Sequence, residues 1–249
     1  MLLQQKQLLK SQNKERRKMN NHEIRLFDVD QDRLHNIMED LPHLAGWYSI
    51  EKNIFETILR ISASESFSNE DLSEVLSCFR QNLISSDGRT LYQLLASYLD
   101  VFGKSIILFD QGTLGFLTSQ ILINLENKKL LKRSYISADL QEIQKMFDFT
   151  NDDISMLSYA SDKSAYKITE RILETNVSDF LVVSLTSFNE PQNLEYRLFQ
   201  PRGKNVTMVS DQNHTDIQSL VLTGSSADIS EAVAQQIAWK LIHKLKFGQ

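Results

Sequence analysis

Cysteine is almost absent from this chain of 249 residues, which contains Cys78 alone. A single cysteine excludes an intrachain disulfide, and neither a cysteine cluster nor a paired-histidine motif offers the spacing of metal ligands. The five histidines are scattered along the chain: His22, His35, His43, His214 and His243. The sequence therefore indicates no metal site and favours a reducing compartment.

Long apolar runs are also missing. No run reaches the ~18 residues that a membrane span requires, and Gln and Lys interrupt the leucines near the start, unlike the apolar core of a signal peptide. The net charge of -5 argues against general nucleic-acid binding by the folded part. We expect a cytoplasmic protein that needs no cofactor and binds neither a membrane nor a specific nucleic acid.

The sequence divides into three parts: a basic segment over 1–21, a helical region over 22–89 and an α/β domain over 90–249. Basic residues among Gln and Asn make the first part a flexible tail, with a nucleic-acid or membrane-surface arm as the alternative. Helical spacing of isoleucines predicts helices in the second part, at Ile50, Ile54, Ile58 and Ile61. Cys78, among apolar neighbours, is expected to be buried.

Two capping signals mark helices, one before the α/β domain and one at its start. Ser68 with Asp71 precedes an apolar run and predicts a capped helix start. A further helix over 90–102 is expected to stop at Gly103.

After Gly103 the pattern changes to strands that alternate with helices, which is typical of a layered α/β fold. An unbroken apolar strand over 180–185 is the clearest, because a strand covered on both faces has no solvated side. The other strands are expected at 105–109, 130–137, 196–200, 205–209 and 218–222, with part of a loop as the alternative for 130–137. The helices are expected at 114–125, 140–147, 164–173 and 229–245.

The segment over 104–121 combines a short apolar strand, a glycine-containing turn and a helix that starts on the turn. In α/β proteins this arrangement builds sites for anionic small molecules, because the first N–H groups of the helix point at the ligand. The segment therefore predicts a pocket without naming its ligand.

The order and local sequence of about 90–246 resemble the C-terminal domain of the CinA family, whose active members are nicotinamide mononucleotide amidohydrolases. The family's A-E-S-C-T-G-G-like turn is similar to the segment from Phe109 to Gly115, its T-G-I-A-G-P segment to that from Thr186 to Pro191, and its G-D-R turn to Gly224, Ser225 and Ser226. The resemblance implies a layered α/β/α domain and self-association through helices that flank the sheet.

The resemblance also implies that the chemistry has been lost. In the family, a Ser attacks the amide, and a Tyr ten residues later and a Lys fifteen residues later assist it. A hydroxyl needs such a base because it is a poor nucleophile alone. These positions are occupied here by Lys128, Ala138 and Ile143, so we expect no catalytic residue among them.

Several residues on the resembling turns are candidates for a ligand pocket: Asp110, Gln111, Gly112, Thr113, Gly115, Thr186, Ser187, Asn189 and Ser226. Each also has a structural interpretation, with Asp110 as a cap and the glycines as turn geometry. The family's glycine and arginine have become Leu114 and Ser226, and Glu190 adds negative charge. These changes disfavour a phosphate.

Two hypotheses follow. The first is a non-catalytic CinA-like domain that serves as a structural or partner-binding module, either as a homodimer or with another protein through the helical region. The second is an amidohydrolase that acts on nicotinamide mononucleotide or a related amide with a rearranged set, such as Ser134, Ser137 and Lys145.

Overall fold

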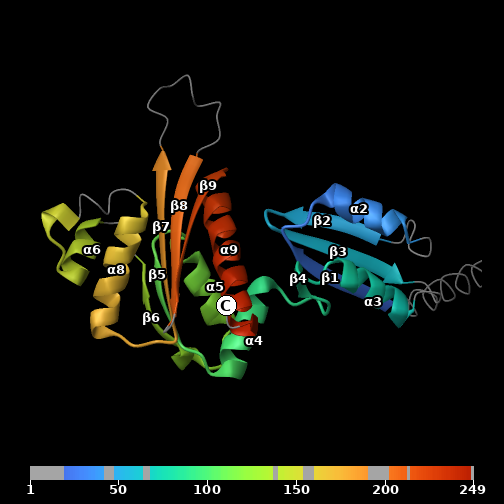
Figure 1. Cartoon of the computed structure of the whole chain (residues 1–249), viewed down its shortest axis with the longest axis horizontal. Coiled ribbons are helices and arrows are strands. Elements are labelled where there is room, and N and C mark those ends of the chain that lie inside the picture. The colour runs from blue at the N-terminus through green and yellow to red at the C-terminus, as the bar shows by residue number, and fades with distance from the viewer. Residues whose placement is uncertain are drawn as a thin grey trace, which may run out of the picture. The chain divides into compact units, whose positions relative to one another are not determined.

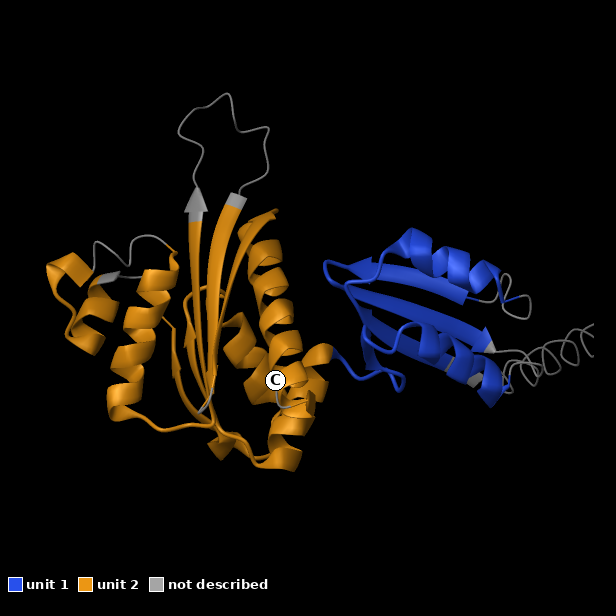
Figure 2. Ribbon diagram, in the orientation of Figure 1, with its two compact units in different colours: residues 1–90 blue, residues 91–249 orange. Residues whose placement is uncertain are grey.

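Two compact units make up the chain, residues 1–90 and residues 91–249 (Figure 2). The structure is a computed structural model that describes residues 20–41, 48–63, 68–136, 140–153, 160–189, 202–211 and 214–247. The boundary lies one residue from the one expected between 89 and 90. Most of the basic segment lies outside the described residues, although β1 begins at Asn20.

Unit 1 is built around a four-stranded antiparallel sheet of order β2-β3-β1-β4 (Figure 1). Its elements are β1 (Asn20–Phe27), α2 (Gln31–Glu39), β2 (Tyr48–Asn53), β3 (Glu56–Ala63), α3 (Asn69–Cys78) and β4 (Leu83–Ser85). This β-α-β-β-α-β succession with the first and third strands at the centre is the split βαβ, or ferredoxin-like, arrangement. The core lies between the sheet and the helices, where Ile24, Leu59 and Val75 are fully buried.

The expectation of a helical region over 22–89 was therefore wrong. Ile50 lies in β2, Ile58 and Ile61 lie in β3, and Ile54 lies in the turn between them with a φ of 48°. These four residues span a β-hairpin, so their regular spacing is not the period of any single helix or strand. The strand β3 is buried on both faces, because Ile58 as well as Leu59 and Ile61 is buried, and its β-branched Thr57, Ile58 and Ile61 were the signal for a strand.

The helix predicted after Ser68 is present as α3, and its capping box is confirmed. The Asp71 N–H donates to Ser68 Oγ at 3.2 Å, and the Ser68 N–H donates to Asp71 Oδ2 at 2.8 Å. Cys78 is exposed rather than buried, because Val75 and Phe79, one turn apart, occupy the core face of this segment.

Unit 2 contains a five-stranded sheet of order β6-β5-β7-β8-β9, in which β6, β5 and β7 are parallel and β7, β8 and β9 form an antiparallel meander. The strands are β5 (Ile106–Asp110), β6 (Leu131–Tyr135), β7 (Phe180–Asn189), β8 (Arg202–Asp211) and β9 (Thr215–Thr223). The helices are α4 (Leu91–Phe102), α5 (Phe116–Asn124), the short η2 (Lys128–Leu130), α6 (Leu140–Phe147), α8 (Asp162–Thr175) and α9 (Ser226–Phe247).

Helices cover both faces of this sheet (Figure 1). The helices α4, α5 and α9 pack together on one face, and α6 and α8 lie on the other. The expected α/β/α layering is confirmed, and so are nearly all of the predicted strands and helices of this unit. The strand expected at 196–200 lies outside the described residues.

The predicted central strand is the core of unit 2. The apolar residues of its first half are all less than 8% exposed: Phe180, Leu181, Val182, Val183 and Leu185. Alternate residues face opposite helical layers, so Leu181, Val183 and Leu185 join the cluster beneath α6 and α8.

Asp179 joins the starts of the two central strands. Its Oδ2 accepts hydrogen bonds from the Ser105 N–H and hydroxyl, both at 2.8 Å, and its Oδ1 accepts one from Lys104 Nζ at 2.9 Å. Burial opposes ionisation of this carboxyl, but the hydrogen bonds outweigh it and lower the pKa of Asp179 to about 2. The ionised side chain therefore stabilises the fold.

We expect Asp179→Asn to cost about 1–2 kcal/mol of unfolding free energy at neutral pH. Because the folded pKa lies below the usual value of 3.8, the wild-type contribution is complete above about pH 4 and is lost as the pH falls through about 2. Urea unfolding at pH 6, 4 and 3 measures the difference in unfolding free energy between the wild type and the variant, which should shrink as the pH falls. The control is Asp87→Asn, which removes an exposed pair with Arg89 and should cost less than about 0.5 kcal/mol. An Asp179→Asn deficit that stays constant down to pH 3 would contradict this assignment.

Candidate functional site

The turn after β5 lies beside Thr186 of β7, but the second turn that the family resemblance implies, after Leu185, is absent because β7 continues as a strand to Asn189. The strands β5 and β7 are parallel and run in register from Ile106 opposite Phe180 to Asp110 opposite Ser184. Beyond Asp110 the chain turns into α5, while β7 continues alongside β8. The side chains that follow β5 therefore meet residues in the middle of β7, at the carboxyl edge of β5.

The buried side chain of Asp110 binds groups at the N-terminal end of α5. Its carboxylate is buried and accepts hydrogen bonds from the Thr113 hydroxyl, the Thr118 hydroxyl at 2.9 Å and the Thr118 N–H at 3.0 Å. The Leu117 N–H donates to Thr113 Oγ1 at 3.1 Å. Burial raises the pKa of Asp110, and the hydrogen bonds from the two threonines act against that rise.

This arrangement uses the N–H groups at the start of α5, which could otherwise bind an anion. The N–H groups at the start of a helix attract a phosphate or carboxylate because they have no partner within the helix. Here the Phe116 N–H donates to the Thr113 carbonyl at 3.0 Å, and the next two N–H groups bind Thr113 and Asp110. The protein's own carboxylate thus occupies the position that an anionic ligand would take.

Gln111 extends the pairing of β5 with β7 by one step. Its Oε1 accepts a hydrogen bond from the Thr186 N–H at 2.9 Å, and its Nε2 donates to the Thr186 carbonyl at 3.4 Å. A side-chain amide carries one acceptor and a donor group, so it pairs with a strand residue as a peptide group does. Both polar ends of Gln111 are therefore held by the backbone of β7.

Gly112 is the point of closest approach between the turn and β7. Its N–H donates to the Ser184 carbonyl at 2.8 Å, and its carbonyl accepts from Thr186 Oγ1 at 2.9 Å. A Cβ at this position would lie 2.1 Å from Ser184 Oγ and 2.8 Å from Asn205 Nδ2. Only glycine fits between these groups.

Asn205 closes the site from β8. This fully buried amide donates to Ser184 Oγ at 3.1 Å, to the Leu185 carbonyl at 2.9 Å and to Thr186 Oγ1 at 3.0 Å. Its Oδ1 accepts from the Thr207 hydroxyl at 2.8 Å. Sequence reasoning missed Ser184, Asn205 and Thr118, and the signal was the presence of small polar residues within otherwise apolar segments.

The remainder of the turn is held in a left-handed backbone conformation. Gly115, directly before α5, has a φ of 84°, and Leu114 has a φ of 51° with its side chain 51% exposed. A Cβ on Gly115 would lie 3.0 Å from the side chain of Ile136. The glycine at 115 is thus required by geometry, whereas Leu114 bears the strain of its conformation.

The other predicted pocket residues lie outside this cluster of contacts. Ser187 is half-buried in β7, and Asn189 is the last residue of that strand, opposite Arg202. Ser226 is the exposed first residue of α9. The N-terminus of α9 is capped by Asp228, whose Oδ2 accepts from the Ser225 hydroxyl at 2.7 Å, which lowers the pKa of Asp228.

The positions of the family's nucleophile and base have structural roles here. Lys128, in η2, donates from Nζ to the carbonyls of Leu122 and Leu125 and so caps the end of α5. Ile143 in α6 is 2% exposed and belongs to the core beneath the sheet. Ala138 lies outside the described residues.

The structure describes two of the three residues suggested for a rearranged active site. Ser134 in β6 is half-buried, and its Oγ lies 2.8 Å from Thr118 Oγ1. Because the Thr118 hydroxyl donates to Asp110, Ser134 donates to Thr118 and completes a chain of three side chains. Lys145 is exposed on α6, and Ser137 lies outside the described residues.

A separate cavity of about 300 Å³ lies at the opposite end of β7. Leu181 at the start of this strand and Ser210 near the end of β8 contribute to its wall, together with the end of α8. None of the predicted pocket residues lines it. Within the described ranges, His, Cys, Asp and Glu side chains form no group of three that could hold a metal ion.

Several solved structures are similar to this chain. The competence or damage-inducible protein from Enterobacter asburiae has 12% identity and a TM-score of 0.51, with 64% of this chain and 100% of that chain covered. The competence damage-inducible protein A from Klebsiella pneumoniae has 13% identity and a TM-score of 0.52, with coverages of 64% and 99%. A CinA superfamily protein from Klebsiella pneumoniae has 15% identity and a TM-score of 0.51, with coverages of 62% and 95%.

Residues 91–249 amount to about 64% of the chain, so the matched share has the size of unit 2. Unit 2 has a divergent CinA fold. Its identity to these structures is too low to carry an activity across, because a shared fold does not fix the chemistry of a site. No protein-family model matches the sequence, and no curated protein does.

We expect Gly112→Ala to destabilise this CinA-fold unit by about 2–3 kcal/mol, because the new Cβ would force the turn away from Ser184 and Asn205. The control is Gly103→Ala. That position has a positive φ of 60° but open space around it, so only the backbone cost of about 1 kcal/mol applies. Thermal and urea unfolding compare the two variants. Equal stability losses would show that the close approach at Gly112 is not required.

Proposed function

We propose that unit 2 is a non-catalytic CinA-fold domain that acts as a structural or partner-binding module. The observation that carries this proposal is the closure of the turn after β5. The polar side chains of Asp110, Gln111 and Thr113 all bind other groups of the protein there. A catalytic turn would need such groups directed at a substrate.

The residues at the family's reactive positions support the same proposal. A nucleophile must be activated by a neighbouring base. Lys128 holds helix carbonyls, and Ile143, where the resemblance would require the base, is an apolar core residue.

No cofactor is part of this proposal, and a cytoplasmic location remains an expectation from the sequence. No helix among the described residues has the length and hydropathy to cross a membrane.

We expect the purified protein to release no ammonia from nicotinamide mononucleotide above the uncatalysed rate. An active CinA-family amidohydrolase assayed in parallel confirms that the assay works. Two variants test the rearranged amidohydrolase directly: Ser134→Ala, which removes one hydrogen bond to Thr118, and Lys145→Ala, which changes an exposed residue of α6. Turnover by the wild-type protein that is lost in either variant would overturn the proposal in favour of that alternative. Turnover retained in both would overturn it in favour of a different set of residues.

A further inference from the structure

Four strands lie at sheet edges within the described residues: β2 and β4 in unit 1, and β6 and β9 in unit 2. The free side of an edge strand presents unpaired N–H and C=O groups to any chain that can form a strand. Proteins usually protect such edges by keeping them short or by placing lysine, other charges or proline on them. The four edges of this protein differ in that protection.

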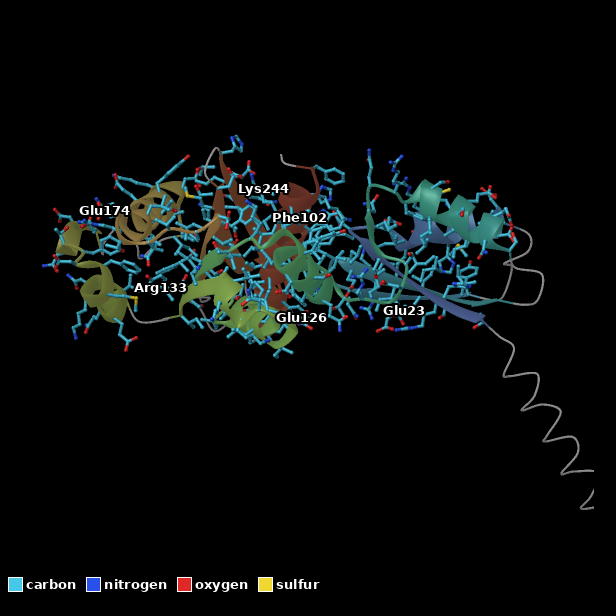
Figure 3. The ribbon with its side chains drawn as sticks, turned by 90° about the horizontal axis from the view of Figure 1, so that it is seen from below. Glu23, Phe102, Glu126, Arg133, Glu174 and Lys244 are labelled. Atoms are coloured by element: carbon cyan, nitrogen blue, oxygen red, sulfur yellow. The ribbon has the colours of Figure 1, made fainter. Side chains whose placement is uncertain are left out.

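Three edges are protected. The strand β4 has only three residues. The five-residue β6 carries Lys132 and Arg133, the latter labelled in Figure 3. The six-residue β2 carries Glu51 and Lys52. Each of these edges therefore has a feature that discourages pairing with another chain.

The β9 edge is long, and among these protections it carries a single acidic residue. It has nine residues, Thr215–Thr223, and contains no lysine, arginine or proline. Its pairing with β8 runs from Ser210 opposite Thr215 to Arg202 opposite Thr223 without a bulge. Its one charged residue, Asp216, forms an ion pair with Lys244 Nζ at 3.0 Å, and this lysine also pairs with Asp211 at 3.2 Å.

The side chains of β9 also leave apolar surface uncovered. Ile217 packs against the core beneath α6 and α8. Val221, four residues further along on the same face of the strand, is 72% exposed. A long, regular and apolar edge strand is a site of association between chains. The edge is therefore suited to a partner that adds a strand.

We propose that β9 pairs antiparallel with β9 of a second copy of this chain, across a two-fold axis. The inference rests on the proposed function, because it names the partner of that module. A self-pairing strand supplies matching backbone groups to its copy, and a two-fold contact is the commonest arrangement of homo-oligomers.

The charges agree with a second copy. Asp216 is near one end of the strand, so an axis at mid-strand keeps the two Asp216 carboxylates at opposite ends of the contact. No other charged residue of β9 meets the copy. A neutral edge also offers nothing to select a charged peptide, which favours self-pairing over a charged partner.

This contact differs from the pairing through flanking helices that the family resemblance implies. The two modes predict different sensitive residues. Pairing of β9 depends on Val221, whereas helix-mediated pairing would depend on exposed apolar residues such as Phe102 of α4, which is 49% exposed and labelled in Figure 3.

The test is the molar mass of the wild-type chain and three lysine variants by light scattering after size exclusion, over a range of concentrations. We expect a wild-type dimer of twice the 28.7 kDa chain mass. Val221→Lys places a charge near the two-fold axis and should weaken the dimer at least about tenfold. Ile123→Lys is the matched control, because Ile123 on α5 is 73% exposed, and it should dimerise as the wild type does. Phe102→Lys should also remain a dimer.

A monomeric wild-type chain at 100 µM would overturn this inference. So would a Val221→Lys variant that dimerises as tightly as Ile123→Lys, or a loss of the dimer in Phe102→Lys alone. Circular dichroism of each variant verifies that it is folded. Ammonia release measured on the same samples keeps the outcome distinct from that of the proposed function, since a dimer can form whether or not the turn is catalytic.

Discussion

The close approach of Gly112 to β7 is the constraint on which the rest of the site depends. Because the turn after β5 lies directly against Ser184, its N–H and carbonyl both pair with β7, and Gln111 continues that pairing on Thr186. The chain then reaches α5 with Asp110 already beneath the first N–H groups of the helix. Because Gly112 has no Cβ, the end of β5, the turn and the start of α5 can pack closely together.

These internal hydrogen bonds give a physical reason why the fold could be kept without a substrate-binding site. The CinA fold needs β5, the turn and α5 in this order, and hydrogen bonds within the protein can satisfy that need without a substrate. Once Asp110 and Thr113 satisfy the helix N-terminus, the same backbone that could hold a phosphate serves stability instead. Under the proposed non-catalytic function, the surface of interest is the sheet edge formed by β9.

Much of unit 2 could be predicted from the sequence, because buried parallel strands are recognisable as apolar runs. Phe180 to Leu185 is such a run, and its two-sided burial followed directly. Unit 1 could not be predicted from isoleucine spacing, since Ile50 and Ile58 lie in two strands joined by a turn and their spacing matches a helical period only by coincidence. Because helices were predicted there, the four-stranded sheet of unit 1 was missed.

The site was predicted only in outline, for a different physical reason. The proximity of Asp110, Thr113 and Thr186 follows from parallel strands, but the direction of their hydrogen bonds depends on contacts distant in sequence. Asn205 reaches Thr186 from a neighbouring strand, and Ser184 determines that residue 112 must be glycine. No local pattern encodes either relation. The sequence therefore located the turn but not its closed state.

The most direct test of this closed state is an NMR titration with nicotinamide mononucleotide, followed at the backbone amides of Gly112, Leu117, Thr118 and Thr186. If the protein's own groups occupy these N–H donors, their resonances should stay unshifted at millimolar ligand and their protons should exchange slowly with solvent. Saturable shifts at these four amides would show that the turn opens to a nucleotide and would contradict the account.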